Sequence, residues 1–96
     1  MKTLTICGSM RFEKEMCSIA YDLETKYGYA VLQCVYAPNN TIISPEELEK
    51  LRQAHYRKID LSDGIYVVNF NGYIGESVKA EIEYAKGQCK EVIFHC

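Results

Sequence analysis

The fold is decided by residues 64–86, which read GIYVVNFNGYIGESVKAEIEYAK. Residues 65–70 are rich in β-branched and aromatic side chains, and this composition predicts a strand. A glycine-bearing loop follows at residues 71–75. The spacing of apolar side chains then predicts a helix from about Ser77 to Lys86, which Gly87 is expected to end. This stretch therefore pairs a strand with the helix that follows it.

The rest of the chain repeats this alternation of strand and helix. Short apolar runs predict further strands at residues 4–7, 30–36 and 91–94. Between the first two runs, helical spacing predicts a helix that Gly28 closes in a left-handed conformation. The inward positions of that helix are expected to be Phe12, Met16, Ile19, Ala20 and Leu23.

A second helix is predicted to begin next to the capping residue Ser44. Pro45 takes the first helical position and Glu47 stands three residues after the cap, which is the pattern of a capping box. Its inward stripe is expected to consist of Leu48, Leu51, His55 and Ile59.

The predicted order is β-α-β-α-β-α-β in a single domain at residues 1–96. This order predicts an α/β protein with a parallel sheet covered by helices. Right-handed crossovers favour the strand order 2-1-3-4, a three-layer flavodoxin-like sandwich with four strands and three helices. Ligands of such sheets bind where the order switches between the first and third strands. The functional site is therefore expected at the loops of residues 8–11 and 69–77.

Composition and charge exclude several classes of protein. The 96 residues are 48% hydrophobic and 25% charged, as in ordinary globular domains. Eleven basic residues stand against 13 acidic ones, and the net charge of −2 argues against nucleic acid as a partner. No apolar run approaches the roughly 20 residues of a membrane helix, and residues 2–7 are too polar for a signal peptide. We expect a cytoplasmic protein without a membrane partner.

Five cysteines form no Cys-x-x-Cys pair, and their odd number argues against a secreted disulfide framework. Neither His55 nor His95 is grouped with them in the sequence, so no metal site is expected. Cys7 and Cys34 lie in strand-like runs and are interpreted as small buried hydrophobic residues. A catalytic thiol is the alternative. The five positions are Cys7, Cys17, Cys34, Cys89 and Cys96.

The first loop, Gly8-Ser9-Met10-Arg11, places two small residues and a base directly before a helix. Free backbone N–H groups together with a guanidinium favour an anion such as a phosphate or a carboxylate. The alternative is that Gly8 and Ser9 only turn the chain and that Arg11 is a surface charge. The sequence has no Gly-x-Gly-x-x-Gly motif and no Walker loop, so no dinucleotide or nucleoside triphosphate cofactor is expected.

Glu81 shares the inward face of the third predicted helix with Val78, Ile82 and Ala85. A carboxylate on such a face needs polar partners, or its pKa rises. Its place at the switch point favours a nucleophile or a general base. The alternative is a boundary glutamate held by nearby donors.

His55 and Asp63 are further candidate catalytic residues, and each also has a structural explanation. A histidine on an apolar face can be a satisfied core residue, and Asp63 can cap the turn into the third strand. Tyr36 and Tyr73 could stack on a nucleobase, or they could be structural aromatic residues.

The chain resembles the nucleoside 2-deoxyribosyltransferase superfamily, particularly its small bacterial members. The resemblance covers residues 6–11, 55–63 and 69–85, and it is most distinctive in Gly-Tyr-Ile-Gly-Glu-Ser and Glu-Ile-Glu-Tyr-Ala of the last segment. It implies cleavage or transfer at the N-glycosidic bond of a nucleoside or nucleoside monophosphate. The family glutamate that attacks the anomeric carbon matches Glu81. The expected substrate-binding residues are Gly8, Ser9, Met10, Arg11, Asn69, Gly72, Tyr73, Gly75 and Ser77.

This chain differs from the family pattern at two positions. Thr5 stands where the monophosphate hydrolases carry an aromatic residue, and His55 stands where many members carry an Asp. Two other functions are considered beside the glycosidic enzyme. One is a non-catalytic sensor or sequestering protein that binds a nucleotide or related metabolite. The other is a thiol-based enzyme or redox protein that uses Cys7 or Cys34. We also expect a homodimer, because one helix cannot cover four strands on its face of the sheet.

Overall fold

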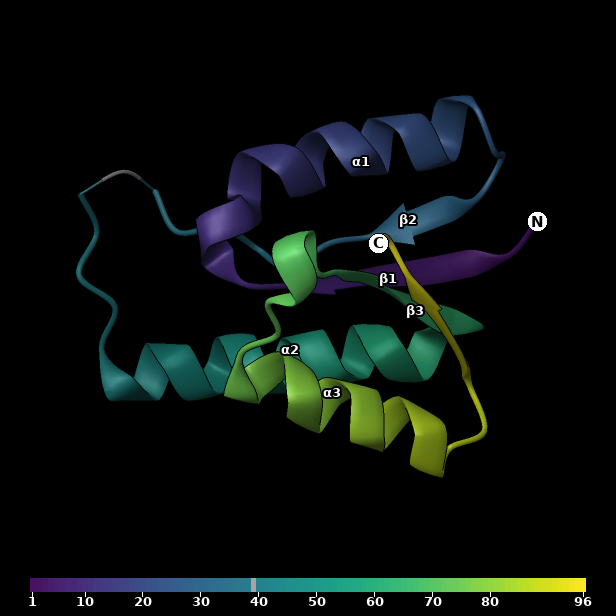
Figure 1. The fold of residues 1–96 in the computed structure, drawn as a ribbon. Helices are drawn as coiled ribbons and strands as arrows, with labels where there is room; N and C mark the ends of the chain where they lie inside the picture. Colours follow the sequence, from purple (N-terminus) through teal and green to yellow (C-terminus); the bar gives the residue numbers. More distant parts are fainter. Residues whose placement is uncertain (39) are drawn as a thin grey trace.

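The computed structural model describes residues 1–38 and 40–96, and it places one sheet between helices (Figure 1). Within these residues four parallel strands lie in the order β2-β1-β3-β4, which confirms the predicted α/β class and strand order. The strands are β1 (Thr3–Gly8), β2 (Ala30–Leu32), β3 (Gly64–Val68) and β4 (Glu91–Phe94). The helices are α1 (Glu13–Thr25), α2 (Pro45–Leu61) and α3 (Glu76–Gly87), with the short 3-10 helices η1 (Met10–Phe12) and η2 (Phe70–Gly72).

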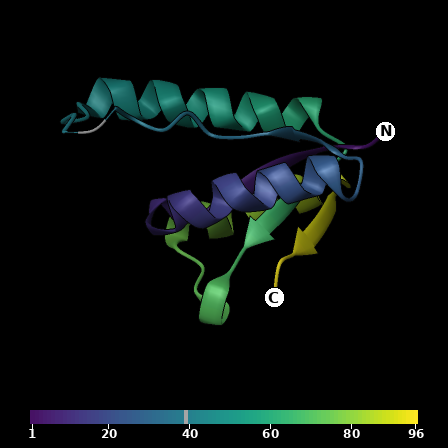
Figure 2. The ribbon, with the colours of Figure 1, turned by 90° about the horizontal axis from the view of Figure 1, so that it is seen from above.

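The helices form a layer on each face of the sheet. As predicted, α1 covers one face, and α2 and α3 cover the other (Figure 1). Seen from above, α2 and β4 lie toward opposite sides of the molecule (Figure 2). Successive side chains of a strand point to opposite faces. Ile6 and Val68 therefore pack with α1, whereas Cys7 and Val67 pack with α2 and α3.

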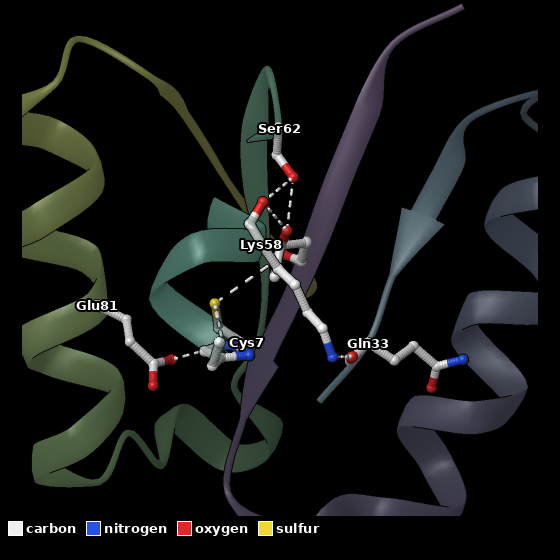
Figure 3. A network of polar contacts seen from close by, with 7 residues as sticks. Cys7, Gln33, Lys58, Ser62 and Glu81 are labelled. Atoms are coloured by element: carbon white, nitrogen blue, oxygen red, sulfur yellow. Dashed lines mark hydrogen bonds and ion pairs between the residues drawn. The ribbon is translucent and has the colours of Figure 1, made fainter. Parts of the chain in front are cut away.

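Strand β2 is shorter than the sequence predicts. Its described pairs with β1 run from Ala30 to Leu32, whereas the apolar pattern continues to Tyr36. The side-chain amine of Lys58 donates a hydrogen bond of 2.6 Å to the Gln33 carbonyl (Figure 3). Helix α2 thus supplies the partner of the first backbone carbonyl after the described pairs of β2.

Helix α2 begins as predicted, but its first turns stay outside the core. Ser44 Oγ accepts a hydrogen bond of 3.1 Å from the Glu47 N–H, and Glu47 Oε1 accepts one of 3.0 Å from the Ser44 N–H, which confirms the capping box. Leu48 is 59% exposed, so its predicted inward position is wrong. The reason is that the start of α2 reaches beyond the sheet (Figure 1). His55 and Ile59 are buried as predicted.

The helices end close to the predicted glycines. Helix α1 ends at Thr25, and Gly28 then takes a left-handed φ of 73°. Helix α3 includes Gly87, and Cys89 takes the left-handed φ, of 58°, after it. Among the described residues, no helix combines the length and the apolar composition that a membrane crossing needs.

Candidate functional site

The loops after β1 and β3 meet at the switch point, as the strand order predicts. Ser9 Oγ accepts a hydrogen bond of 3.3 Å from the Arg11 N–H, which caps η1. The Arg11 guanidinium then lies over the Tyr73 ring, 4.0 Å from its centroid. Phe12 contacts the Phe70 ring edge to face, with centroids 5.2 Å apart. These contacts join the first predicted loop to the glycine-bearing loop.

Gly8 is tightly packed at the end of β1. A Cβ at this position would lie 2.8 Å from Met16 Sδ and 3.2 Å from Val68 Cβ. A larger residue would therefore require the Met16 side chain to move and Val68 to shift by a few tenths of an ångström. Met10, which follows in η1, is 55% exposed. Of these two candidate substrate-binding residues, Gly8 thus has a structural role and Met10 is accessible.

Glu81 points inward from α3, as its helical spacing predicts. Its side chain is only 12% exposed, and Oε1 lies 3.4 Å from Nε2 of His55 on α2. Figure 3 shows the carboxylate directed from α3 toward the end of β1, where Cys7 lies. The inward carboxylate therefore has an imidazole as its neighbour.

Cys7 contacts the same nitrogen of the imidazole as Glu81 does. Its Sγ is 3.5 Å from His55 Nε2, and the two residues are 1% and 7% exposed. His55 Nδ1 is buried and has no hydrogen-bond partner among the described residues. The expectation that neither histidine groups with a cysteine is thus wrong for His55. The fold brings the two together from positions 48 residues apart.

Burial raises the pKa of the Cys7 thiol well above its usual value, and the negative charge of Glu81 raises it further. Burial also raises the pKa of the Cys34 thiol. A nucleophilic thiol needs a lowered pKa and a nearby cation. These environments therefore argue against the thiol-based enzyme.

Asp63 lies at the opposite edge of the sheet from these groups. It directly precedes β3, and its Oδ2 accepts a hydrogen bond of 2.8 Å from the Thr3 N–H at the start of β1. Its carboxylate thereby fastens the amino ends of two central strands. The structure does not bring Asp63 together with His55 and Glu81.

The remaining candidates of the second loop lie between β3 and the first turn of α3. Asn69 Oδ1 accepts a hydrogen bond of 2.9 Å from the Cys96 N–H. Gly72 has a φ of 74°, in the left-handed region that favours glycine. Gly75 is the N-cap of α3, and Ser77 lies exposed in its first turn. The loop therefore leads directly into the helix that carries the inward carboxylate.

Two surface hollows lie away from the switch point. One is at the amino ends of the strands and is lined in part by Lys2, Asp63 and Glu91. The other lies between α2 and α3 and is lined in part by Tyr56 and Tyr84. Arg11 and Tyr73, in contrast, stand on the surface. An anion would therefore approach the guanidinium directly from solvent.

Cys7 is the member of this site that the sequence predicts to be a small buried hydrophobic residue, with a catalytic thiol as the alternative. Its neighbour Ile6 packs with α1, so strand alternation alone turns Cys7 toward α2 and α3. The predicted inward stripe of α2 contains His55. These two signals together could have placed the thiol and the imidazole on the same face of the sheet.

Comparisons with family models, with curated proteins and with solved structures find no match to this chain. The class of protein is therefore set by its architecture, a small α/β protein with a four-stranded parallel sheet.

Proposed function

We propose that this protein cleaves or transfers at the N-glycosidic bond of a nucleoside or nucleoside monophosphate, with Glu81 as the nucleophile. The observation that carries the proposal is the inward Glu81 carboxylate, 12% exposed and 3.4 Å from an imidazole, on the helix that follows the switch-point loop. The resemblance of residues 6–11, 55–63 and 69–85 to the nucleoside 2-deoxyribosyltransferase superfamily supports the same assignment.

The reaction has two displacements at the anomeric carbon C1′. The bond from C1′ to the base nitrogen breaks with oxocarbenium character, and its electron pair leaves with the base, which takes up a proton from solvent. The ionised Glu81 carboxylate forms the new C1′–O bond. Water or a second nucleobase then attacks C1′, releases the carboxylate and gives up a proton to solvent.

His55 acts as a positioning residue for the carboxylate. With its ring proton on Nε2, it points a donor at Glu81 Oε1 from 3.4 Å. The helix dipole acts most strongly in the first turn of a helix. Glu81 is the sixth residue of α3 and therefore lies beyond that turn. The neighbouring imidazole is therefore the main group that orients the carboxylate.

Arg11 is the anion-binding group of this proposal. Its guanidinium is held over Tyr73 and keeps its N–H groups for a phosphate, with which it can form paired charge-assisted hydrogen bonds. The N-cap Gly75 of the helix precedes Glu81 by six residues, about 9 Å along the helix axis. The sugar of a nucleotide would span from the phosphate at the loop toward the carboxylate.

The test is incubation of the protein with a panel of nucleosides and their 5′-monophosphates, followed by chromatography of free base. We expect the wild-type protein to release base and Glu81→Gln to release none. Glu83→Gln is the matched control, because Glu83 is exposed on the same helix.

Two results would contradict the proposal. One is unchanged turnover in Glu81→Gln. The other is an absence of free base from every substrate of the panel, together with a rise in thermal stability when intact nucleotide is added. The second result would identify a nucleotide-binding protein without catalysis.

A further inference from the structure

We propose that Cys7, His55 and Glu81 form a binding site for a soft divalent metal ion, such as Zn²⁺, with one open coordination position. Their ligand atoms Sγ, Nε2 and a carboxylate oxygen all lie within 4.8 Å of one another. Three different elements supply them, namely β1, α2 and α3. The site shares Glu81 with the proposed glycosidic reaction, but binding of the ion is measured without a nucleoside.

The distance from His55 Nε2 to Glu81 Oε1 is long for a good hydrogen bond. An N–H···O bond prefers about 2.7–3.2 Å between its heavy atoms. His55 Nε2 instead lies 3.4 Å from Glu81 Oε1, whereas its distance of 3.5 Å to Cys7 Sγ is ordinary for a hydrogen bond to sulfur. A neutral imidazole also has only one proton for these two neighbours. The contact between Nε2 and Oε1 is therefore the weakly satisfied part of this buried cluster.

The same distances match the edges of a zinc tetrahedron. Zinc bonds of about 2.3 Å to sulfur and about 2.0–2.1 Å to nitrogen or oxygen give edges of about 3.5 Å for S···N and about 3.3 Å for N···O. The observed edges are 3.5 Å and 3.4 Å. An ion between the three groups would therefore require little movement of the Cys7–His55 and His55–Glu81 pairs.

The donor set selects the class of ion. Thiolate and imidazole ligands favour zinc and similar transition metals, whereas Ca²⁺ and Mg²⁺ require oxygen ligands. The Cys7 thiolate and the Glu81 carboxylate together offset the two positive charges of the ion. A neutral assembly of this kind avoids the cost of an uncompensated charge in the core.

Binding of the ion displaces one proton to solvent. The ion takes the electron pairs of the Cys7 sulfur and of His55 Nε2, and the Cys7 proton leaves, because a coordinating thiol is deprotonated outright. Because Nε2 binds the ion through its lone pair, the single proton of the neutral imidazole moves from Nε2 to Nδ1. Glu81 is the member nearest to solvent, with a side chain 12% exposed, so water on its side would fill the open position.

The test is titration of the metal-free protein, without nucleoside, with Zn²⁺ against a chromophoric chelator. A parallel titration with Co²⁺ reports sulfur ligation through the thiolate-to-cobalt absorption band. We expect one ion per chain and a sulfur–cobalt band in the wild-type protein. Cys7→Ser should lose the band, and Glu81→Gln should weaken binding roughly 10-fold or more, since even outer-shell changes cost that much.

Matched controls separate this site from other thiols. Cys17→Ser and Glu83→Gln change exposed residues of the same types, and both should bind like the wild-type protein. Circular dichroism checks the fold of each variant. If Cys7→Ser fails to fold, Glu81→Gln still tests the site through its weaker metal binding. The Glu81 side chain is 12% exposed, so this change is less disruptive to the core.

Two outcomes would overturn the metal site. One is a sulfur–cobalt band that persists in Cys7→Ser or vanishes in Cys17→Ser. The other is a wild-type protein that binds neither ion. Metal binding without base release would support this site while contradicting the proposed glycosidic activity, so the two proposals can fail separately.

Discussion

The Arg11 guanidinium lies over the Tyr73 ring, 4.0 Å from its centroid. Arg11 follows β1 and Tyr73 follows β3, so this contact connects the two loops at which the strand order switches. An exposed cation–π contact contributes about 0.5–1 kcal/mol. The contact therefore orients the guanidinium without using its hydrogen-bond donors.

The first prediction concerns the phosphate of the substrate. Arg11→Ala should weaken binding of a nucleoside monophosphate more than binding of the matching nucleoside. Loss of a charge-assisted hydrogen bond costs about 1.5–3 kcal/mol, which is roughly tenfold or more in affinity. Calorimetric titration of both ligands measures the difference. Arg57→Ala, which changes an exposed residue of α2, is the control. If Arg11→Ala weakens binding of the two ligands equally, Arg11 contacts the sugar instead.

Local pattern accounts for most of the fold. Periodicity placed Val78, Ile82 and Ala85 on the buried face of α3, and the same spacing turned Glu81 inward. These positions follow from the 3.6-residue repeat alone. The strand order followed from the handedness of the crossovers.

Contacts between distant segments account for what the sequence could not predict. Just after the end of β2, the Gln33 carbonyl bonds to Lys58, which is 25 residues away in the sequence. The contact between Cys7 and His55 depends on the position of α2 along the direction of β1. The local sequence pattern of neither element predicts that position. The Asp63 carboxylate accepts a hydrogen bond from the Thr3 N–H at the amino ends of the strands. These two residues are neighbours only because β1 and β3 pair in the sheet.

The second prediction concerns the contact that fixes α2 against β1. Thr5 is fully buried, and its hydroxyl bonds to Ser62 Oγ and lies 3.0 Å from the Lys58 carbonyl oxygen. Thr5→Val should cost about 0.5–1.5 kcal/mol, since Ser62 keeps its own bond to that carbonyl. Chemical denaturation measures the loss.

A double-mutant cycle isolates this network. Thr5→Val combined with Ser62→Ala should cost less than the sum of the two single changes, because the two hydroxyls share one bond. Additive costs would show that the hydroxyls act independently. Thr41→Val, an exposed threonine change, should leave stability nearly unchanged.

The third prediction concerns pH and the packing of α2 against α3. The Tyr84 hydroxyl donates a hydrogen bond of 2.6 Å to Asp60 Oδ1, and this bond lowers the pKa of the Asp60 carboxyl. The folded-state pKa is below the unfolded one. The stabilisation is therefore present above the unfolded value, about 3.9, and is lost as the pH falls through the folded value.

Tyr84→Phe should therefore lower the melting temperature at neutral pH and make little difference at about pH 2–3. The variant keeps the edge contact with the Tyr56 ring, whose centroid lies 4.8 Å from that of Tyr84. Thermal unfolding at both pH values measures the effect. Tyr21→Phe on α1, at a side chain 70% exposed, should show no difference at either pH. If Tyr84→Phe lowers the melting temperature equally at both pH values, ionisation of Asp60 is excluded as the cause.

The last prediction is that the protein forms a homodimer through the carboxyl edge of the sheet. Large apolar side chains stand in solvent between β2 and the first turns of α2, where Val35 is 62%, Ile42 is 93% and Leu48 is 59% exposed. A second copy that covers them removes apolar surface from water, at about 25 cal/mol per Å². Light scattering at micromolar concentration should therefore give about twice the chain mass of 11.0 kDa. Ile42→Lys should shift the protein to the monomer. The control is Leu61→Lys at the far end of α2, which should leave the dimer intact. A mass of 11.0 kDa for the wild-type protein would refute the dimer.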